Sequence, residues 1–242
     1  MKLIIVRHGE PNYEIDGLTE KGRREADLLA DRLCREDITS FYCSPLGRAR
    51  LTAMPTAKRL NREPEILPWL REFDADKVKL PYLDKEACCW DILPEYIDSL
   101  EKIYHPTEWL NEDFIKNSAI PSAYENVCRE LDKILELHGY KRDGYNYTAI
   151  KPNHDTIVFV CHFGLTGVLL SHLLNCSPYS IWQHTCIAPT GVTTLYTEER
   201  IEGKALFRAA CIGDTSHLYS AGEEPSFAAR FCECFTDDTR HN

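Results

Sequence analysis

The chain has 242 residues, of which 43% are hydrophobic and 27% charged, a composition that excludes global disorder and predicts a packed core. This length suits one large α/β domain, or one domain with an inserted subdomain. The formal net charge of −10 argues against general binding to nucleic acid or to an anionic membrane, so an anionic substrate needs a local cluster of basic residues.

Cysteine usage indicates a reducing compartment. The chain has eleven cysteines, an odd number, and no C-x-x-C pair. Cys43, Cys128 and Cys161 stand in apolar segments, where a thiol behaves as a small hydrophobic group. We therefore expect reduced cysteines, no disulfide framework and a cytoplasmic protein.

Two apolar runs rich in β-branched residues predict buried strands. Residues 3–6 read Leu-Ile-Ile-Val, and residues 157–161 read Ile-Val-Phe-Val-Cys. The second run continues as an apolar stretch to Leu174, but His162 and Gly164 interrupt it. A strand, a turn and a helix explain this stretch better than a membrane span does.

Capping signals predict where helices begin. Thr19 is a good N-cap, Ser44-Pro45 predicts an N-cap and a first helical position, and residues 122–125 form a capping box. In chain order we expect a strand at 2–6, a helix at 19–36, a strand at 38–42, a helix at 44–60, a short strand at 65–67, a helix at 122–138, a loop at 139–155, a strand at 156–161, a helix at 164–174, a short helix from 177, and strands at 192–196 and 205–211.

The segment 73–121 has an irregular pattern that includes Pro81, Pro94 and Pro106, and we expect an inserted lid or helical region there. Elsewhere helices alternate with strands, which predicts a mostly parallel sheet. The expected fold is α/β, with three layers (α/β/α), helices on both faces of the sheet and a helical insertion. We expect residues 1–242 to form one domain.

Residues suited to anion chemistry follow several of the predicted strands. Arg7-His8 follow the first strand, Arg48 lies in the first turn of the helix after the second, Glu72 follows the third, and His162 follows the strand at 156–161. In an open α/β sheet, ligands bind outside the carboxyl ends of the strands. These side chains are therefore expected at one edge of the sheet.

Phosphate is the anion that this set of side chains suits best. The dianion of a phosphomonoester needs cations and N–H donors around it. A neutral imidazole can attack phosphorus and form a phosphohistidine, and an acid must protonate the poor alkoxide leaving group. The helix after His162 adds N-terminal amides that can bind phosphate.

The same residues resemble the histidine phosphatase superfamily, which includes the cofactor-dependent phosphoglycerate mutases. Several ordered segments over about residues 1–218 carry the resemblance, and together they are far more specific than a lone Arg-His-Gly. They are Arg7-His8-Gly9-Glu10, Leu18-Thr19-x-x-Gly22, Ser44-x-x-x-Arg48-Ala49-x-x-Thr52-Ala53, Leu70-Arg71-Glu72, and Val160-Cys161-His162 with the C-terminal run Gly213–Leu218.

The resemblance implies the role of each site residue. His8 would be the nucleophile, Arg7, Arg48 and His162 would form the phosphate pocket, and Glu72 would act as the acid and later as the base that activates water. Two more phosphate ligands are candidates. Asn12 could substitute for a family asparagine at the position of Glu14, and Phe163 replaces the usual glycine but keeps an amide donor. The resemblance implies no metal and no other cofactor.

The sequence favours a phosphatase acting on a small phosphorylated metabolite. A mutase of the phosphoglycerate type and a non-catalytic phospho-ligand binding protein remain alternatives. Asp74, Asp76 and Asp91 are alternatives to Glu72 for the acid. Four further histidines lack metal-ligand spacing, namely His154, His172, His184 and His217. The substrate and the oligomeric state stay open.

Overall fold

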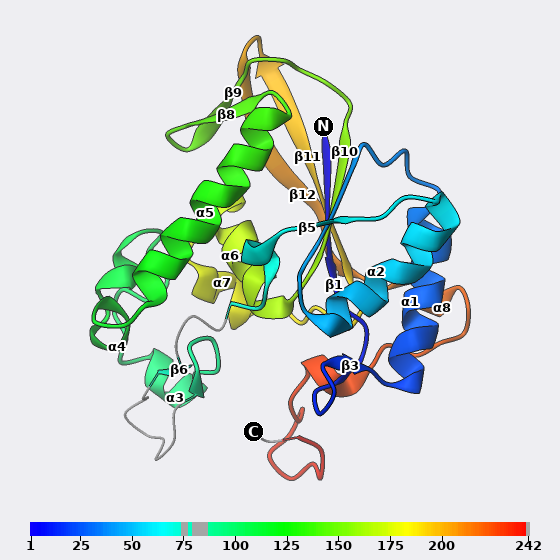
Figure 1. The fold of residues 1–242 in the computed structure, drawn as a ribbon. Helices are drawn as coiled ribbons and strands as arrows, with labels where there is room; N and C mark the ends of the chain where they lie inside the picture. Colours follow the sequence, from blue (N-terminus) through cyan, green and yellow to red (C-terminus); the bar gives the residue numbers. More distant parts are fainter. Residues whose placement is uncertain (74–76, 79–86, 241–242) are drawn as a thin grey trace.

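A mixed sheet forms the middle of the molecule (Figure 1). The computed structural model describes residues 1–73, 77–78 and 87–240. Within these residues the sheet has eight strands, parallel from β5 to β1 and antiparallel beyond. Their spatial order is β5 (Glu65–Ile66), β4 (Ser40–Cys43), β10 (Thr156–Cys161), β1 (Lys2–Arg7), β11 (Val192–Ile201), β12 (Lys204–Asp214), β9 (Asn146–Ala149) and β8 (Tyr140–Asp143).

The two apolar runs form the central strands β1 and β10, as predicted. Both are buried nearly throughout, because helices cover both faces of the sheet there. Leu3 and Ile5 belong to one core, and Ile4 and Val6 belong to the other. Side chains alternate between the faces of a strand, so one continuous apolar run supplies both cores.

Helices lie on both sides of this sheet (Figure 1). The helices α1 (Glu20–Leu33) and α2 (Gly47–Leu60) cover one face, and α5 (Ile120–Leu137), α6 (Phe163–Leu174) and α7 (Pro178–Trp182) cover the other. This arrangement confirms the predicted three-layer α/β/α fold. Its parallel half carries the strand ends on which the site residues were predicted.

Capping predicted one helix start correctly and two incorrectly. Thr19 accepts the N–H of Gly22 and caps α1. The helix α2 begins at Gly47 rather than Pro45, because the Ser44 hydroxyl contacts His162 instead of capping a helix. The helix α5 begins at Ile120, and the hydroxyl of Ser122 donates to the carbonyl of Ala119.

The predicted loop at 139–155 was wrong, since β8 and β9 form a hairpin there. Asp143 pairs with Asn146 across the turn, and Gly144 has a φ of +59°. The two turn residues are therefore Gly144 and Tyr145, and glycine suits the first of them because that position needs a positive φ, which glycine adopts without strain. The predicted strands at 192–196 and 205–211 are present but longer, as β11 and β12.

The described part of 73–121 contains short helices packed against the core. They are α3 (Pro94–Ile97) and α4 (Asp113–Lys116), with a 3₁₀ turn at Glu108–Asn111 and a strand pair of β6 (Lys77–Val78) and β7 (Ala87–Cys88). Trp109 is fully buried and contacts the rings of Tyr124 and Tyr179. Two of the candidate acids, Asp74 and Asp76, lie outside the described residues.

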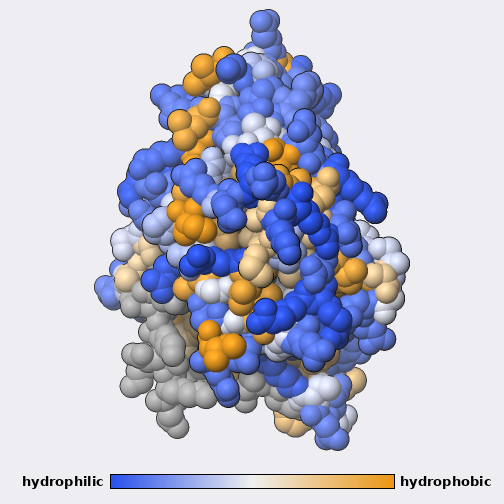
Figure 2. Space-filling model, turned by 45° about the vertical axis from the view of Figure 1, so that its right-hand side comes forward, coloured by the Kyte–Doolittle hydropathy of each residue, from blue (hydrophilic) through white to orange (hydrophobic). Residues whose placement is uncertain are grey.

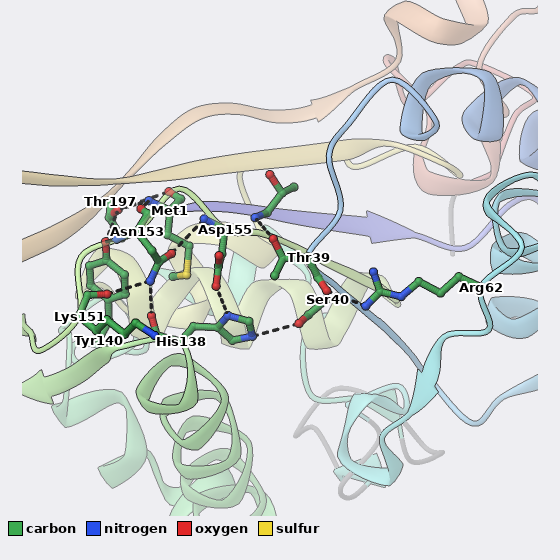
Figure 3. A network of polar contacts seen from close by, with 11 residues as sticks. Met1, Thr39, Ser40, Arg62, His138, Tyr140, Lys151, Asn153, Asp155 and Thr197 are labelled. Carbon is green, nitrogen blue, oxygen red and sulfur yellow. Dashed lines mark hydrogen bonds and ion pairs between the residues drawn. The ribbon is translucent and has the colours of Figure 1, made fainter.

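A polar network ties together the amino ends of the strands, opposite the predicted site (Figure 3). The N-terminal ammonium of Met1 donates to the carbonyl of Asn153. His138, at the end of α5, contacts Asp155 through Nδ1 at 2.8 Å and the Ser40 hydroxyl through Nε2 at 3.2 Å. The Ser40–His138–Asp155 chain therefore fixes α5 to β4 and β10, and we assign it a structural role.

The surface in Figure 2 is mostly hydrophilic, with separate hydrophobic patches between the polar groups. Within the described residues, no helix combines the length and apolar character needed to cross a membrane.

Candidate active site

The site residues meet at the carboxyl ends of β1, β10 and β4. Arg7 pairs with Cys161 across β1 and β10, so the chain leaves these neighbouring strands with His8 beside His162. The centroids of the two imidazole rings are 5.1 Å apart. Arg48, from the first turn of α2, donates its Nε–H to His8 Nε2 at 3.3 Å. The structure thus brings four of the predicted site residues together.

His8 is held as a neutral imidazole with one fixed tautomer. Its side chain is 1% exposed, and Nδ1 lies 2.7 Å from the carbonyl oxygen of Gly9. A carbonyl only accepts, so Nδ1 carries the hydrogen and Nε2 keeps its lone pair. Burial, followed by the charge of Arg7, lowers the pKa of His8 to about 3. His8 therefore offers an unprotonated nitrogen in a cationic setting.

The loop after His8 needs glycine where it packs on α1. A Cβ on Gly9 would lie 2.7 Å from the Gly22 carbonyl oxygen, and one on Gly22 would lie 2.3 Å from the Glu10 carbonyl oxygen. The amide of Gly9 donates to the Thr52 hydroxyl. The sequence motifs around Gly9, Gly22 and Thr52 are therefore parts of one contact that places His8.

Arg7 keeps one buried donor without a partner. Its side chain is only 7% exposed, and Nη1 donates to the Ile187 carbonyl at 2.7 Å. Its Nε is buried and has no hydrogen-bond partner among the described residues. Burial lowers the pKa of Arg7, but a guanidinium stays charged in proteins. Such a donor suits an oxygen of a bound anion, since buried polar groups are normally paired.

Arg48 is oriented by Asp16, a residue that the sequence did not single out. Asp16 accepts from Arg48 Nη1 and from the Gly47 amide, both at 2.6 Å. Burial acts to raise the pKa of Asp16, but the hydrogen bonds from Gly47 and Arg48 prevail and hold it below its usual range. Asp16 has a φ of +45° in the turn before α1, and no local sequence pattern marks its pairing with Arg48.

His162 is completely buried and is oriented by Ser44. Its Nε2 lies 2.7 Å from Ser44 Oγ, which also accepts the Leu46 amide at 3.3 Å. Since that oxygen already accepts one N–H, we assign its hydrogen to the bond with Nε2, which leaves Nδ1–H as a donor. Nδ1 is buried and has no partner among the described residues. Burial, followed by the His8 interaction, holds the pKa of His162 well below its ordinary value, so the ring is neutral.

Glu72 reaches the first turn of α6 from the segment after β5. Its Oε1 accepts the amides of Phe73 at 2.8 Å and of Leu165 at 3.0 Å. Burial raises the pKa of Glu72, although these two amides, Arg7 and Arg48 oppose that shift. Both bonds end on Oε1, so Oε2 is the oxygen suited to carry a proton.

Glu72 also lines a cavity of about 480 Å³. Trp69, Phe73, Val127 and Leu165 supply apolar wall, and Arg71, Asn126 and Glu130 supply polar groups. His8, Arg7, Arg48 and His162 do not line this cavity. Glu72 thus lines the cavity, and its carboxyl group also interacts electrostatically with Arg7 and Arg48 of the cluster.

The remaining candidate residues differ in position. Phe163 is the first residue of α6, and the centroid of its ring lies 5.8 Å from the guanidinium carbon of Arg7. Asn12 Oδ1 accepts the Glu14 amide in the turn between β2 (Pro11–Asn12) and β3 (Gly17–Leu18), and no described contact joins it to His8 or the arginines. Asp91 is exposed. The structure brings neither Asn12 nor Asp91 into the cluster.

The other histidines are dispersed. His172 contacts Asp132, His184 contacts Tyr104, and His217 contacts Thr190. No group of three or more His, Cys, Asp or Glu side chains in the described part of the chain is arranged to hold a metal ion.

Comparison with known proteins agrees with this arrangement. Residues 3–87 match the model of the histidine phosphatase superfamily, branch 1. The chain is 27% identical over 184 residues to phosphoserine phosphatase 1 of Hydrogenobacter thermophilus, covering 71% of this chain and 79% of that protein. It is 25% identical over 235 residues to a probable phosphatase of Schizosaccharomyces pombe, covering 91% and 96% of the two chains.

The fold matches a solved structure with a TM-score of 0.59. That structure is the phosphoserine phosphatase of Entamoeba histolytica in complex with 3-phosphoglyceric acid, with 21% identity over 90% of this chain and 98% of the other. The family match, the relatives and the shared fold agree with the motifs around His8, Arg48 and His162. Residues 3–87 thus match the histidine phosphatase superfamily, and over most of its length the chain is similar in sequence and in fold to known phosphatases.

Proposed function

We propose that the chain hydrolyses a small phosphomonoester through a phosphohistidine formed on His8. The observation that carries this proposal is the state of His8: a buried, neutral ring with Nδ1 bonded to the Gly9 carbonyl and Nε2 beside Arg48. The lone pair on Nε2, which accepts the Arg48 Nε–H in this structure, is what an attack on phosphorus requires, and Arg48 would turn this N–H to a phosphoryl oxygen when substrate binds. The carboxyl group of Glu72 interacts with Arg7 and Arg48 at the same edge of the sheet, which supports an acid–base role for Glu72.

In the first step His8 Nε2 attacks phosphorus, and the bond between phosphorus and the ester oxygen breaks. The proton on Glu72 passes to that oxygen, so the alcohol leaves neutral. In the second step Glu72, now a carboxylate, takes a proton from water, and the oxygen of that water attacks the phosphohistidine. Phosphate leaves, and both His8 and Glu72 return to their starting states.

Donors around the phosphoryl group stabilise the charge that develops in both steps. We assign this role to the Nε of Arg7, which has no partner among the residues that the structure describes, and to the guanidinium of Arg48, the Nδ1–H of His162 and the amide of Phe163. None of these donors requires a metal ion. Asn12 stays a candidate ligand that would have to leave its turn contact with Glu14.

Relatives suggest the kind of substrate to test first. Phosphoserine and 3-phosphoglycerate are named for similar proteins, so we propose a small phosphorylated metabolite of this size. We also propose that residues 1–242 work as one domain, with 73–121 as an inserted region, and that the protein works in the cytoplasm. The location rests on the odd cysteine count without a C-x-x-C pair.

The test measures phosphate release and covalent labelling together. Wild-type protein should release phosphate from phosphoserine or from another metabolite in a panel, and it should take up an acid-labile phosphoryl label from ³²P-labelled substrate. His8→Ala should lose both. Labelling that survives in His8→Ala would place the nucleophile elsewhere, with His162 the first residue to examine.

The same assay separates the two alternatives. A mutase would interconvert 3-phosphoglycerate and 2-phosphoglycerate with little phosphate release, and a binding protein would bind phosphate without turning over an aryl phosphate. Either result would reject the phosphatase proposal.

A further inference from the structure

Glu25 is a buried carboxyl group that the proposed mechanism does not use. It lies on α1 with a side chain that is 0% exposed. Its Oε2 accepts the backbone N–H of Glu10 at 2.8 Å, and its Oε1 is buried with no hydrogen-bond partner among the described residues. Glu10 is two residues after His8, so Glu25 holds the loop that carries the proposed nucleophile.

Glu10 connects three parts of the chain at this point. Its amide binds Glu25, and its carboxylate accepts the hydroxyls of Thr19 before α1 and of Ser226 in the C-terminal segment. Gly22 approaches the Glu10 backbone so closely that a Cβ there would lie 2.3 Å from the Glu10 carbonyl oxygen, so the loop packs tightly against α1. A change at Glu25 therefore acts directly on the position of His8.

The charges facing Glu25 come from each neighbouring element. They are Glu10 from the loop after β1, Lys21 and Arg24 from α1, and Glu223 from the segment after α8 (Ser216–Tyr219). Lys21 forms its ion pair with Glu223 at 3.4 Å, so no cation pairs with Glu25 in the described structure. The charge of Glu25 also acts on Arg7, in the proposed phosphate pocket.

We propose that Glu25 is a positioning residue for the nucleophile loop, and that a negative charge on Glu25 weakens the binding of an anion at Arg7. The hydrogen bond to Glu10 and the unpartnered second oxygen carry this proposal. An ionised Glu25 partly neutralises the field that Arg7 presents to the anion, whereas a protonated Glu25 does not. The proposal rests on the proposed function for the identity of the anion as phosphate.

The carboxyl group of Glu25 gains or loses its charge near physiological pH. Burial first, and then the nearby Glu10 charge, raise the pKa of Glu25 to about 7 against the opposing hydrogen bond from the Glu10 amide. Anion binding then favours the protonated form of Glu25 and is accompanied by proton uptake near neutral pH. The site should hold phosphate more weakly as the pH rises through this range.

Two substitutions separate the hydrogen bond from the charge. Glu25→Gln keeps an oxygen for the Glu10 amide and removes the charge. Glu25→Leu removes both and keeps the volume. Glu20→Gln is the matched control, because Glu20 lies on the same helix with a side chain that is 94% exposed.

The experiment measures the dissociation constant of inorganic phosphate by calorimetry from about pH 5.5 to about pH 8.5, and kcat on the best substrate. The dissociation constants of the wild type and of Glu25→Gln should agree at the low end. At the high end the wild type should bind about tenfold more weakly, the change that one pKa unit of coupling produces. Comparing the two proteins at each pH cancels the ionisation of phosphate itself, and Glu20→Gln should follow the wild type.

Glu25→Leu should lose kcat at every pH, while Glu25→Gln keeps most of it. Parallel binding curves for the wild type and Glu25→Gln would overturn the charge effect, and a wild-type kcat in Glu25→Leu would overturn the positioning role. If Glu25→Leu does not fold, the comparison with Glu25→Gln still decides the charge effect, and Glu25→Met, which also removes the hydrogen bond, takes the place of Glu25→Leu in the kcat test. A wild-type protein that binds phosphate but releases none from any substrate would reject the proposed function and leave the binding comparison valid.

Discussion

Replacing Glu72 with glutamine removes the ionisable proton of this side chain and changes its size little. The glutamine oxygen can accept the same amides of Phe73 and Leu165 that Glu72 Oε1 accepts, so the contact with α6 is retained. The substituted group cannot deliver a proton to a leaving oxygen. The variant therefore tests the acid role directly, without disturbing the fold.

The size of the effect depends on the leaving group. General acid catalysis is worth on the order of 10²- to 10⁴-fold, or about 3–5 kcal/mol in the barrier. An alkoxide needs that proton, whereas p-nitrophenolate scarcely does. We expect Glu72→Gln to lower kcat/KM for an alkyl phosphate such as phosphoserine by about 10²-fold or more, and for p-nitrophenyl phosphate by less than about tenfold.

The assay is kcat/KM for both esters across pH. This ratio reports the steps up to formation of the phosphohistidine, so a later role of Glu72 in activating water does not disturb it. Burial raises the pKa of Glu72, and the acid must be protonated, so wild-type kcat/KM on the alkyl ester should fall as pH rises through that raised value. This decline should be missing in Glu72→Gln.

Glu130→Gln is the control, because Glu130 lines the same cavity as Glu72. This substitution should leave kcat/KM unchanged for both the alkyl and the aryl ester. Equal losses on the two esters in Glu72→Gln would refute the acid role and assign Glu72 to binding or folding. The acid would then be sought at Asp74, Asp76 or Asp91.

The other predictions use the same assays. Arg48→Lys should lower kcat/KM by about ten- to a hundredfold, because an ammonium cannot copy the fork that contacts His8 and Asp16; near wild-type rates would remove Arg48 from the phosphate ligands. Ser44→Ala should lower kcat about tenfold, since it frees the His162 ring, and should cost about 1–3 kcal/mol of stability because the buried Nε2 of His162 loses its partner; an unchanged kcat would show that the Ser44 contact does not matter. Prolonged dialysis against a chelator should leave turnover intact, and activity restored by one added divalent ion would contradict this. Glu25→Gln should raise the melting temperature above about pH 7 and leave it unchanged near pH 4, measured by calorimetry. The raised pKa of Glu25 means that the folded state binds its proton more tightly than the unfolded state, so stability is lost as pH rises through about 7; equal shifts at both pH values would argue against that buried charge.

Local patterns in the sequence were sufficient for the central strands and for the edge on which the site lies. The runs before Arg7 and His162 are apolar throughout, and only a strand buried on both faces makes such a run favourable. Strands of one parallel sheet end at a common edge, so the residues that follow them were expected to meet. The same reasoning identified Thr19 as a cap, since a cap acts within three residues of its own position.

Longer contacts were decided by the tertiary structure. Ser44 has the sequence of a helix cap, yet its hydroxyl binds His162, which is 118 positions away. Glu72 accepts the amide of Leu165 across 93 positions, and only the packing of α6 against the segment after β5 brings them together. The hydrogen bond between Ser44 and His162 competes with the preference of Ser44 to cap a helix, which is worth only about 1 kcal/mol.

The sequence by itself determined that His8 and His162 stand at strand ends, because burial of an apolar strand depends on the residues of that strand. It did not determine that the two rings are 5.1 Å apart, since this distance follows from the pairing of Arg7 with Cys161. Nor did it determine that Glu25 holds the Glu10 amide, because α1 must first pack against the loop. Strand register and helix packing are properties of the whole core, and they convert residues of suitable chemistry into a site.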